Sequence, residues 1–195
     1  MVVDEELNRK KELILGHELV FANRIGAAIF ERPKVSFWMV LIPLLFLYFI
    51  YRMQRYRNGR VKFDEEFMVT RRRVMDLAVE SVAMGAEPDV NRVVRQADLS
   101  DSLQEPYASW IRVLAEYYMD LLSADGQSFE LLVRSAYGDR TTYLLILNRL
   151  GSAEKEFYSA IKPRMAETEG AISIIAAIEE QSRQVRRELA ERIFA

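Results

Sequence analysis

The longest uninterrupted run of apolar positions lies between residues 35 and 51 and reads VSFWMVLIPLLFLYFIY. Its seventeen residues carry no formal charge, and eleven of them are Leu, Ile, Phe or Val. Each of these four residue types favours insertion by about 0.3–0.6 kcal/mol at the centre of a membrane helix. A helix of this length covers about 25 Å, against about 30 Å for the hydrocarbon core of a bilayer. The pattern predicts a transmembrane helix over 35–51; the alternative is a buried core helix of a soluble domain.

Aromatic and basic residues border this apolar stretch. Trp38 lies near one end, and Tyr48 and Tyr51 lie near the other, as is typical of side chains at a membrane interface. Pro43 at the midpoint predicts a kink, and the alternative is a hairpin that enters and leaves the membrane on the same face. The residues that we expect to contact lipid headgroups are Lys34, Arg52, Arg55, Arg57, Arg60 and Lys62.

Outside this stretch, apolar positions recur at steps of three and four residues, which predicts helices throughout. The N-terminal part shows the pattern over residues 4–30 and ends before Pro33, so we expect an amphipathic helix that lies in the membrane interface or packs on a partner. The fold class expected for the rest is all-α, a bundle or irregular array of about five to seven helices. The expected helices are 64–84, 88–97, 106–123, 128–137, 139–150, 152–166 and 171–194.

The predicted domains are an amphipathic N-terminal helix (1–34), the transmembrane helix (35–51), a basic juxtamembrane connector (52–63) and a soluble all-α domain (64–195). Residues 1–63 carry eleven Lys/Arg and six Asp/Glu, whereas residues 64–195 carry sixteen and twenty-three. The acidic distal domain argues against a nucleic-acid ligand. Five basic residues on the carboxyl side of the apolar stretch, against three on the amino side, predict a single-pass protein of a bacterial inner membrane with a cytoplasmic C-terminal domain.

Residues that carry catalytic or metal chemistry are scarce. There is no cysteine, and the single histidine, His17, precedes the apolar stretch, so a Ser-His-Asp triad or a histidine metal site within residues 64–195 is excluded. Glu116 and Asp120 share a helix face but lack the Glu-x-x-His partners of a di-iron bundle. The loop 137–143, YGDRTTY, is the most site-like segment, and we interpret it as a corner between helices that Asp139 caps. No catalytic, cofactor or metal residues are predicted, and no cofactor is expected.

We therefore expect a non-enzymatic, membrane-anchored helical protein that contacts lipid and docks other proteins, as a scaffold, assembly factor or accessory subunit of a membrane complex. Whether it forms a homo-oligomer stays open. The alternative is a membrane-tethered regulatory or sensory module that binds a small ligand. A third hypothesis is a membrane-bound enzyme that uses carboxylates on lipid. The aromatic residues that could line a ligand pocket in the second case are Trp110, Tyr117, Tyr118 and Tyr143.

Overall fold

A computed structural model describes residues 2–29, 67–97, 99–165 and 171–195. These residues form seven helices and no strands, which confirms the all-α class. None of the described helices is both long and apolar enough to cross a membrane. The stretch 35–51 lies outside the described residues, so its transmembrane character stays a prediction. The helices are α1 (Val2–Ile29), a helix over 67–84, α4 (Val90–Gln96), α5 (Asp101–Ser123), α6 (Phe129–Tyr137), α7 (Arg140–Met165) and α8 (Ala171–Ile193).

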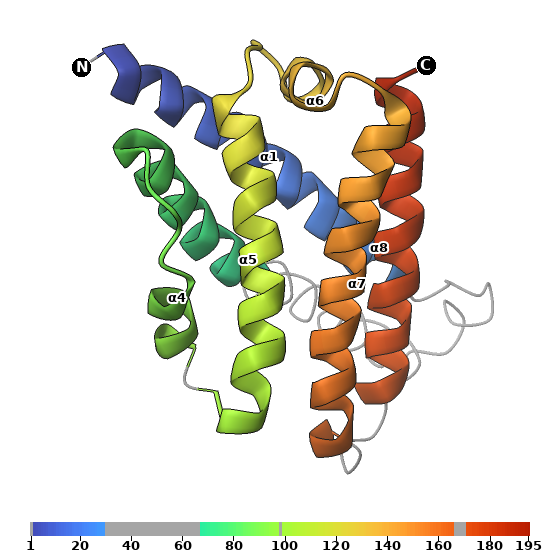
Figure 1. Ribbon diagram of the computed structural model, residues 1–195. Helices are drawn as coiled ribbons and strands as arrows, with labels where there is room; N and C mark the ends of the chain where they lie inside the picture. Colours follow the sequence, from blue (N-terminus) through green and yellow to red (C-terminus); the bar gives the residue numbers. More distant parts are fainter. Residues whose placement is uncertain (1, 30–66, 98, 166–170) are drawn as a thin grey trace, which may run out of the picture.

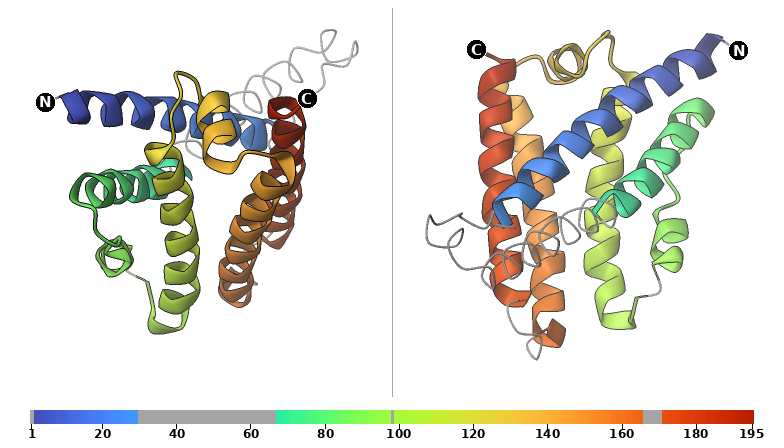
Figure 2. Two further views of the ribbon diagram at one scale, coloured as in Figure 1. Left: turned by 45° about the horizontal axis from the view of Figure 1, so that its top comes forward. Right: turned by 180° about the vertical axis from the view of Figure 1, so that it is seen from behind.

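Three long helices form the frame of the fold. α7 and α8 run antiparallel side by side, α5 packs against α7, and the short α6 lies across one end of this frame (Figure 1). α1 crosses the back of the frame diagonally, and the helix over 67–84 runs beside it (Figure 2). α5 is the most deeply embedded helix, because its apolar residues occur at three- and four-residue steps from Tyr107 to Leu122 and are buried.

The principal core draws its side chains from every described helix, and fully buried members include Ile14, Val74, Tyr118, Leu132 and Tyr143. A second, smaller cluster joins the last turns of α1 to α8. Its buried members are Phe21, Ile25 and Val185, and Phe67 and Ile178 pack against them. Burying a side chain of this size contributes roughly 1.5–3 kcal/mol. The smaller cluster therefore holds the C-terminal end of α1 firmly against helices that follow the apolar stretch.

The place of α1 is the main difference from the sequence-based expectation. It was expected to lie in a membrane interface or on a partner, but Leu7, Ile14 and Ala22 are buried against the rest of the described chain. Within this chain α1 contacts α5, α6 and α8. Val20, in contrast, is 57% exposed. Amphipathicity shows that one face of a helix must be buried, but it does not show which surface buries that face.

Two helix boundaries also differ from prediction. α5 begins at Asp101, one turn before Pro106, because Leu103 is buried and its backbone N–H bonds to the Ser100 carbonyl at 2.8 Å. The two helices expected over 139–150 and 152–166 are one, α7, which continues through Gly151 and past Pro163. A β-carbon on Gly151 would lie 3.4 Å from an Arg186 nitrogen, so the missing side chain lets this guanidinium approach the helix.

Candidate functional site

A buried ion network ties five helices together at the centre of the molecule. Its members are Glu18 of α1, Arg71 of the helix over 67–84, Tyr118 of α5, Glu154 of α7 and Arg186 of α8; we call them the Glu18 network. Arg71 donates from Nε to Glu18 (2.7 Å) and from Nη2 to Glu154 (3.1 Å). Glu154 also pairs with Arg186 Nη1 at 2.7 Å, and the Tyr118 hydroxyl donates to Glu18 at 3.0 Å. Two cations and two carboxylates balance one another in this network.

Helical spacing places these charges inside. Glu18 stands at the fourth position after Ile14 and the third before Phe21, on the same stripe that buries both apolar residues. Arg71 occupies the equivalent position between Phe67 and Val74. The sequence analysis did not single out Arg71, because three arginines follow one another at 71–73 and nothing local shows which of them is buried. In the structure only the two arginines that follow Arg71 are exposed, whereas Arg71 itself is 1% exposed.

Aromatic rings complete the surroundings of the buried cations. The Arg71 guanidinium carbon lies 3.8 Å from the centroid of the Phe67 ring and 5.8 Å from that of Phe21. The Arg186 guanidinium carbon lies 5.3 Å from the same Phe21 ring. Cation–π contacts of this kind contribute about 0.5–2 kcal/mol when they are desolvated. The rings therefore add attraction on faces of the guanidinium groups that carry no hydrogen-bonding hydrogens.

Electrostatics fix the protonation states of the network. Burial by itself would raise the pKa of Glu154, but Arg186 and Arg71 outweigh it and hold that pKa below its usual value. Burial and the neighbouring Glu18 raise the pKa of Tyr118 well above its usual value, so its hydroxyl stays a donor. Burial would lower the pKa of Arg71, but the adjacent carboxylates raise it. These shifts keep Glu154 ionised, Tyr118 protonated and Arg71 cationic at neutral pH, so none of these three is a general acid or base near pH 7.

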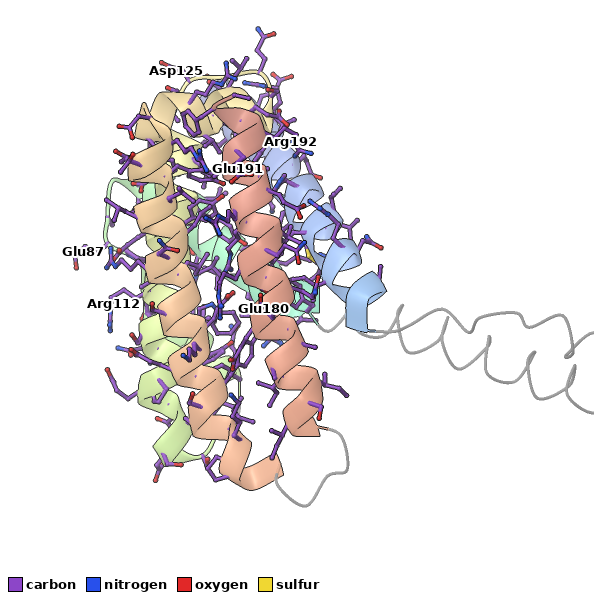
Figure 3. The ribbon with its side chains drawn as sticks, turned by 90° about the vertical axis from the view of Figure 1, so that its right-hand side faces the viewer. Glu87, Arg112, Asp125, Glu180, Glu191 and Arg192 are labelled. Carbon is purple, nitrogen blue, oxygen red and sulfur yellow. The ribbon has the colours of Figure 1, made fainter. Side chains whose placement is uncertain are left out.

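A solvent-open pocket adjoins this network between α7 and α8, with a volume of about 520 Å³. The side chains of Glu154 and Arg186 line it, and small residues such as Gly151 and Ser182 leave the space. Figure 3 views the α7–α8 pair from its side, with Glu180 on the outer surface of α8. A pocket of this size is within the range of small-molecule sites, about 300–1,000 Å³.

The loop 137–143 takes the structural role that the sequence indicated. Gly138 has a φ of +72° and ends α6. The Asp139 carboxylate then accepts hydrogen bonds from the backbone N–H groups of Thr141 (2.7 Å) and Thr142 (3.0 Å), which caps α7. These hydrogen bonds lower the pKa of Asp139. The neighbouring Arg140 is not simply solvated, because it pairs with Glu191 at 2.9 Å on the surface.

The aromatic residues that were candidates for a ligand pocket lie in the core instead. Trp110, Tyr117, Tyr118 and Tyr143 are all at most 5% exposed. Trp110 stacks on Phe157, and the hydroxyls of Tyr117 and Tyr143 lie 3.3 Å apart. None of the four lines the pocket between α7 and α8.

The predicted carboxylate pair is also engaged elsewhere. Glu116 pairs with Arg149 at 2.8 Å, while Asp120 accepts a hydrogen bond from the Tyr137 hydroxyl. Across the described ranges, no group of three or more potential metal ligands comes together.

The predicted membrane residues all lie in 30–66, outside the described part of the chain. They are the anchor residues Trp38, Pro43, Tyr48 and Tyr51 and the headgroup residues Lys34, Arg52, Arg55, Arg57, Arg60 and Lys62. The Glu18 network, which the sequence analysis did not find, lies within the described residues. Comparison with known proteins finds no protein-family model, no curated protein and no solved structure that matches this chain.

Proposed function

We propose that this chain is a membrane-anchored, non-enzymatic helical protein that docks other proteins, and that its apolar stretch enters and leaves the membrane on one face. The observation that carries the topology is the packing of α1 on helices that follow the stretch. The sequence alone favoured a single span, with α1 and residues 64–195 on opposite sides. The contacts of the described residues support the alternative of a same-face insertion.

The pairing of α1 with the helix over 67–84 supports this topology. Lys11 pairs with Asp76 at 2.7 Å, and seven residues later Glu18 pairs with Arg71, also at 2.7 Å. Positions that advance along α1 thus meet positions that recede along the other helix, so the two helices are antiparallel. The end of α1 and the start of the helix over 67–84 consequently lie at the same end of this pair. A single span would separate these partners by about 30 Å of hydrocarbon, and none of their contacts would form.

The length of the apolar stretch limits how deep a same-face insertion reaches. Two arms of about eight residues each rise roughly 12 Å as helix, which is less than half of a core of about 30 Å. The proposed insertion is therefore confined to one leaflet. The basic residues that border the stretch on both sides would then lie on the same face and would no longer compete for orientation. By the positive-inside rule, these basic residues favour the cytoplasm as the location of that face and of the helical body.

The absence of cysteine allows a direct test of the topology by single-cysteine labelling of the full chain. Asn8→Cys places a thiol on the exposed surface of α1, and Glu87→Cys places one in the exposed loop before α4 (Figure 3). In sealed inner-membrane vesicles of known sidedness, we expect a membrane-impermeant maleimide to label both positions in the same vesicle orientation. Labelling in opposite orientations would restore the single span, and detergent-opened vesicles control for reactivity.

The docking role is consistent with the charged side chains of the described residues, which form structural ion pairs and helix caps and do not gather into a set of catalytic groups. Its test is photocrosslinking in intact membranes from Leu145, which is 63% exposed on α7. The matched control is the same photoreactive residue at Arg112, an exposed position on α5. A discrete protein adduct from position 145 and not from position 112 supports docking. Equal diffuse labelling from both positions contradicts it.

A further inference from the structure

We propose that the pocket between α7 and α8 binds a small anionic ligand, one that carries a phosphate or carboxylate group, through Arg186, Tyr158 and Ser182. The proposal goes beyond the membrane and docking function and does not depend on it. It rests on the balance of donors, acceptors and charge around the pocket.

Hydrogen-bond donors without acceptors line this pocket. Ser182 is 5% exposed, and neither its hydroxyl nor that of Tyr158 has a hydrogen-bond partner within the described ranges. Burial and Glu154 raise the pKa of Tyr158, so this hydroxyl keeps its proton at neutral pH. Neither oxygen is among the fully buried unpartnered side-chain atoms of the described residues, so both hydroxyls reach the solvent of the pocket and can donate to a ligand there. A ligand that brings acceptors would satisfy both hydroxyls.

Arg186 supplies charged donors at the inner wall. It is 7% exposed, and its one ion-pair partner among the described residues is Glu154, which it meets through Nη1. A guanidinium group has five N–H donors, so this contact leaves others for a ligand. Gly151 stands opposite, and its missing β-carbon preserves the space around the guanidinium.

The charge of the lining also favours an anion. Lys155, Arg183, Arg186 and Arg187 face two carboxylates, Glu154 and Glu179. Both carboxylates already have cationic partners, because Glu154 meets Arg71 and Arg186, and Glu179 meets Lys162 at 3.0 Å. Lys155 is exposed and has no ion-pair partner in the part of the chain that the structure describes. Arg183 and Arg187 also have partners, Glu180 at 3.1 Å and Glu191 at 3.8 Å, so the positive charge of the lining that is left to attract an anion is that of Lys155.

Isothermal titration of the full chain in a zwitterionic detergent tests the proposal with phosphate, glycerol phosphate and succinate, each against sodium chloride of equal ionic strength. We expect saturable binding of at least one of these anions. Tyr158→Phe and Ser182→Ala each remove a donor without leaving a buried charge, and each is expected to weaken binding about tenfold, which corresponds to about 1.4 kcal/mol. Wild-type affinity in both variants would overturn the assignment.

A charge-matched pair of variants separates a local site from general attraction. Lys155→Gln and Arg149→Gln each remove one exposed positive charge from α7, but only Lys155 lines the pocket. We expect weaker binding for the first and unchanged binding for the second. A lipid source is tested with phosphatidylglycerol vesicles: binding there that Tyr158→Phe weakens assigns the anion to a headgroup. No saturable binding to any soluble anion or vesicle refutes the proposal.

Discussion

Replacing Arg71 with methionine should be among the most destabilising single changes in this protein. Methionine fills the volume of the aliphatic stem, but it leaves Glu18 buried with the Tyr118 hydroxyl as its remaining partner in the network. Glu154 keeps Arg186, so the cost falls mainly on Glu18. Removing one partner of a buried ion pair typically costs about 3–5 kcal/mol. The lost cation–π contact with Phe67 adds to this cost.

The adjacent Arg72 provides a matched control. It is exposed on the same helix, so Arg72→Met removes the same charge at the surface and should change the free energy of unfolding by less than about 0.5 kcal/mol. Urea denaturation of the detergent-solubilised full chain provides the measurement. The chain has two tryptophans, so a Trp38→Phe background makes the buried Trp110 the only tryptophan, and its selectively excited fluorescence is the reporter.

A double variant keeps the test informative where Arg71→Met unfolds the chain. Adding Glu18→Gln removes the stranded charge, and we expect it to recover at least about 1 kcal/mol of the loss, because partners in one network are energetically coupled. The reasoning would be refuted by equal urea midpoints for Arg71→Met and Arg72→Met, or by a double variant less stable than Arg71→Met alone.

Three further changes probe other parts of the fold. His17 is the only histidine, and burial lowers its pKa below 6.5. The unfolded chain therefore takes up the proton first, and stability should fall as the pH drops below about 6.5. In His17→Phe, the midpoint of unfolding should depend less on pH when it is measured across about pH 5 to 8. Tyr118→Phe removes a hydrogen bond to the buried Glu18 and should cost about 1.5–3 kcal/mol in urea denaturation, and a loss below about 0.5 would contradict this. Gly126→Ala would place a β-carbon 2.7 Å from a backbone nitrogen of α6. Thermal unfolding should therefore show a free energy of unfolding lower by about 1–3 kcal/mol. Unchanged stability would mean that this turn relaxes without cost.

The periodic pattern predicted most helices because each buries one face. Ser128 and Gly138 were correctly assigned as the borders of α6, since a side-chain cap and a positive φ have local sequence signals. The pattern failed at Gly151, where a break was expected. A mid-helix glycine costs about 1 kcal/mol, but here it gives the Arg186 guanidinium room to pack. That contact joins positions 35 residues apart, so no local rule predicts it.

The Glu18 network had a signal that the sequence analysis did not use. Glu18 interrupts the stripe of Ile14, Phe21 and Ile25, and Arg71 interrupts a second stripe in the same way. A single charge on an apolar stripe indicates a buried partner of opposite sign, because an unpaired buried charge is too costly. Two such stripes with opposite charges favour mutual pairing. The two residues are 53 positions apart in the sequence. A prediction that assigns the two sides of the apolar stretch to separate domains does not consider that they pair.

The order of synthesis bears on how the proposed same-face topology would be reached. α1 and the apolar stretch are made before the helix over 67–84, α7 and α8 exist, so Glu18 has no cationic partner in the network when the stretch first meets a membrane. Translocating α1 at that stage would carry its charged side chains, four basic and five acidic, across the hydrocarbon core, where each charge is costly. If α1 stays on the side of the membrane where the chain is synthesised, it can still pack on the helices that follow. Arg71 is synthesised later and then pairs with the Glu18 carboxylate of α1. The cost of translocating charged side chains and the buried ion pairing thus favour the same outcome by different physical routes.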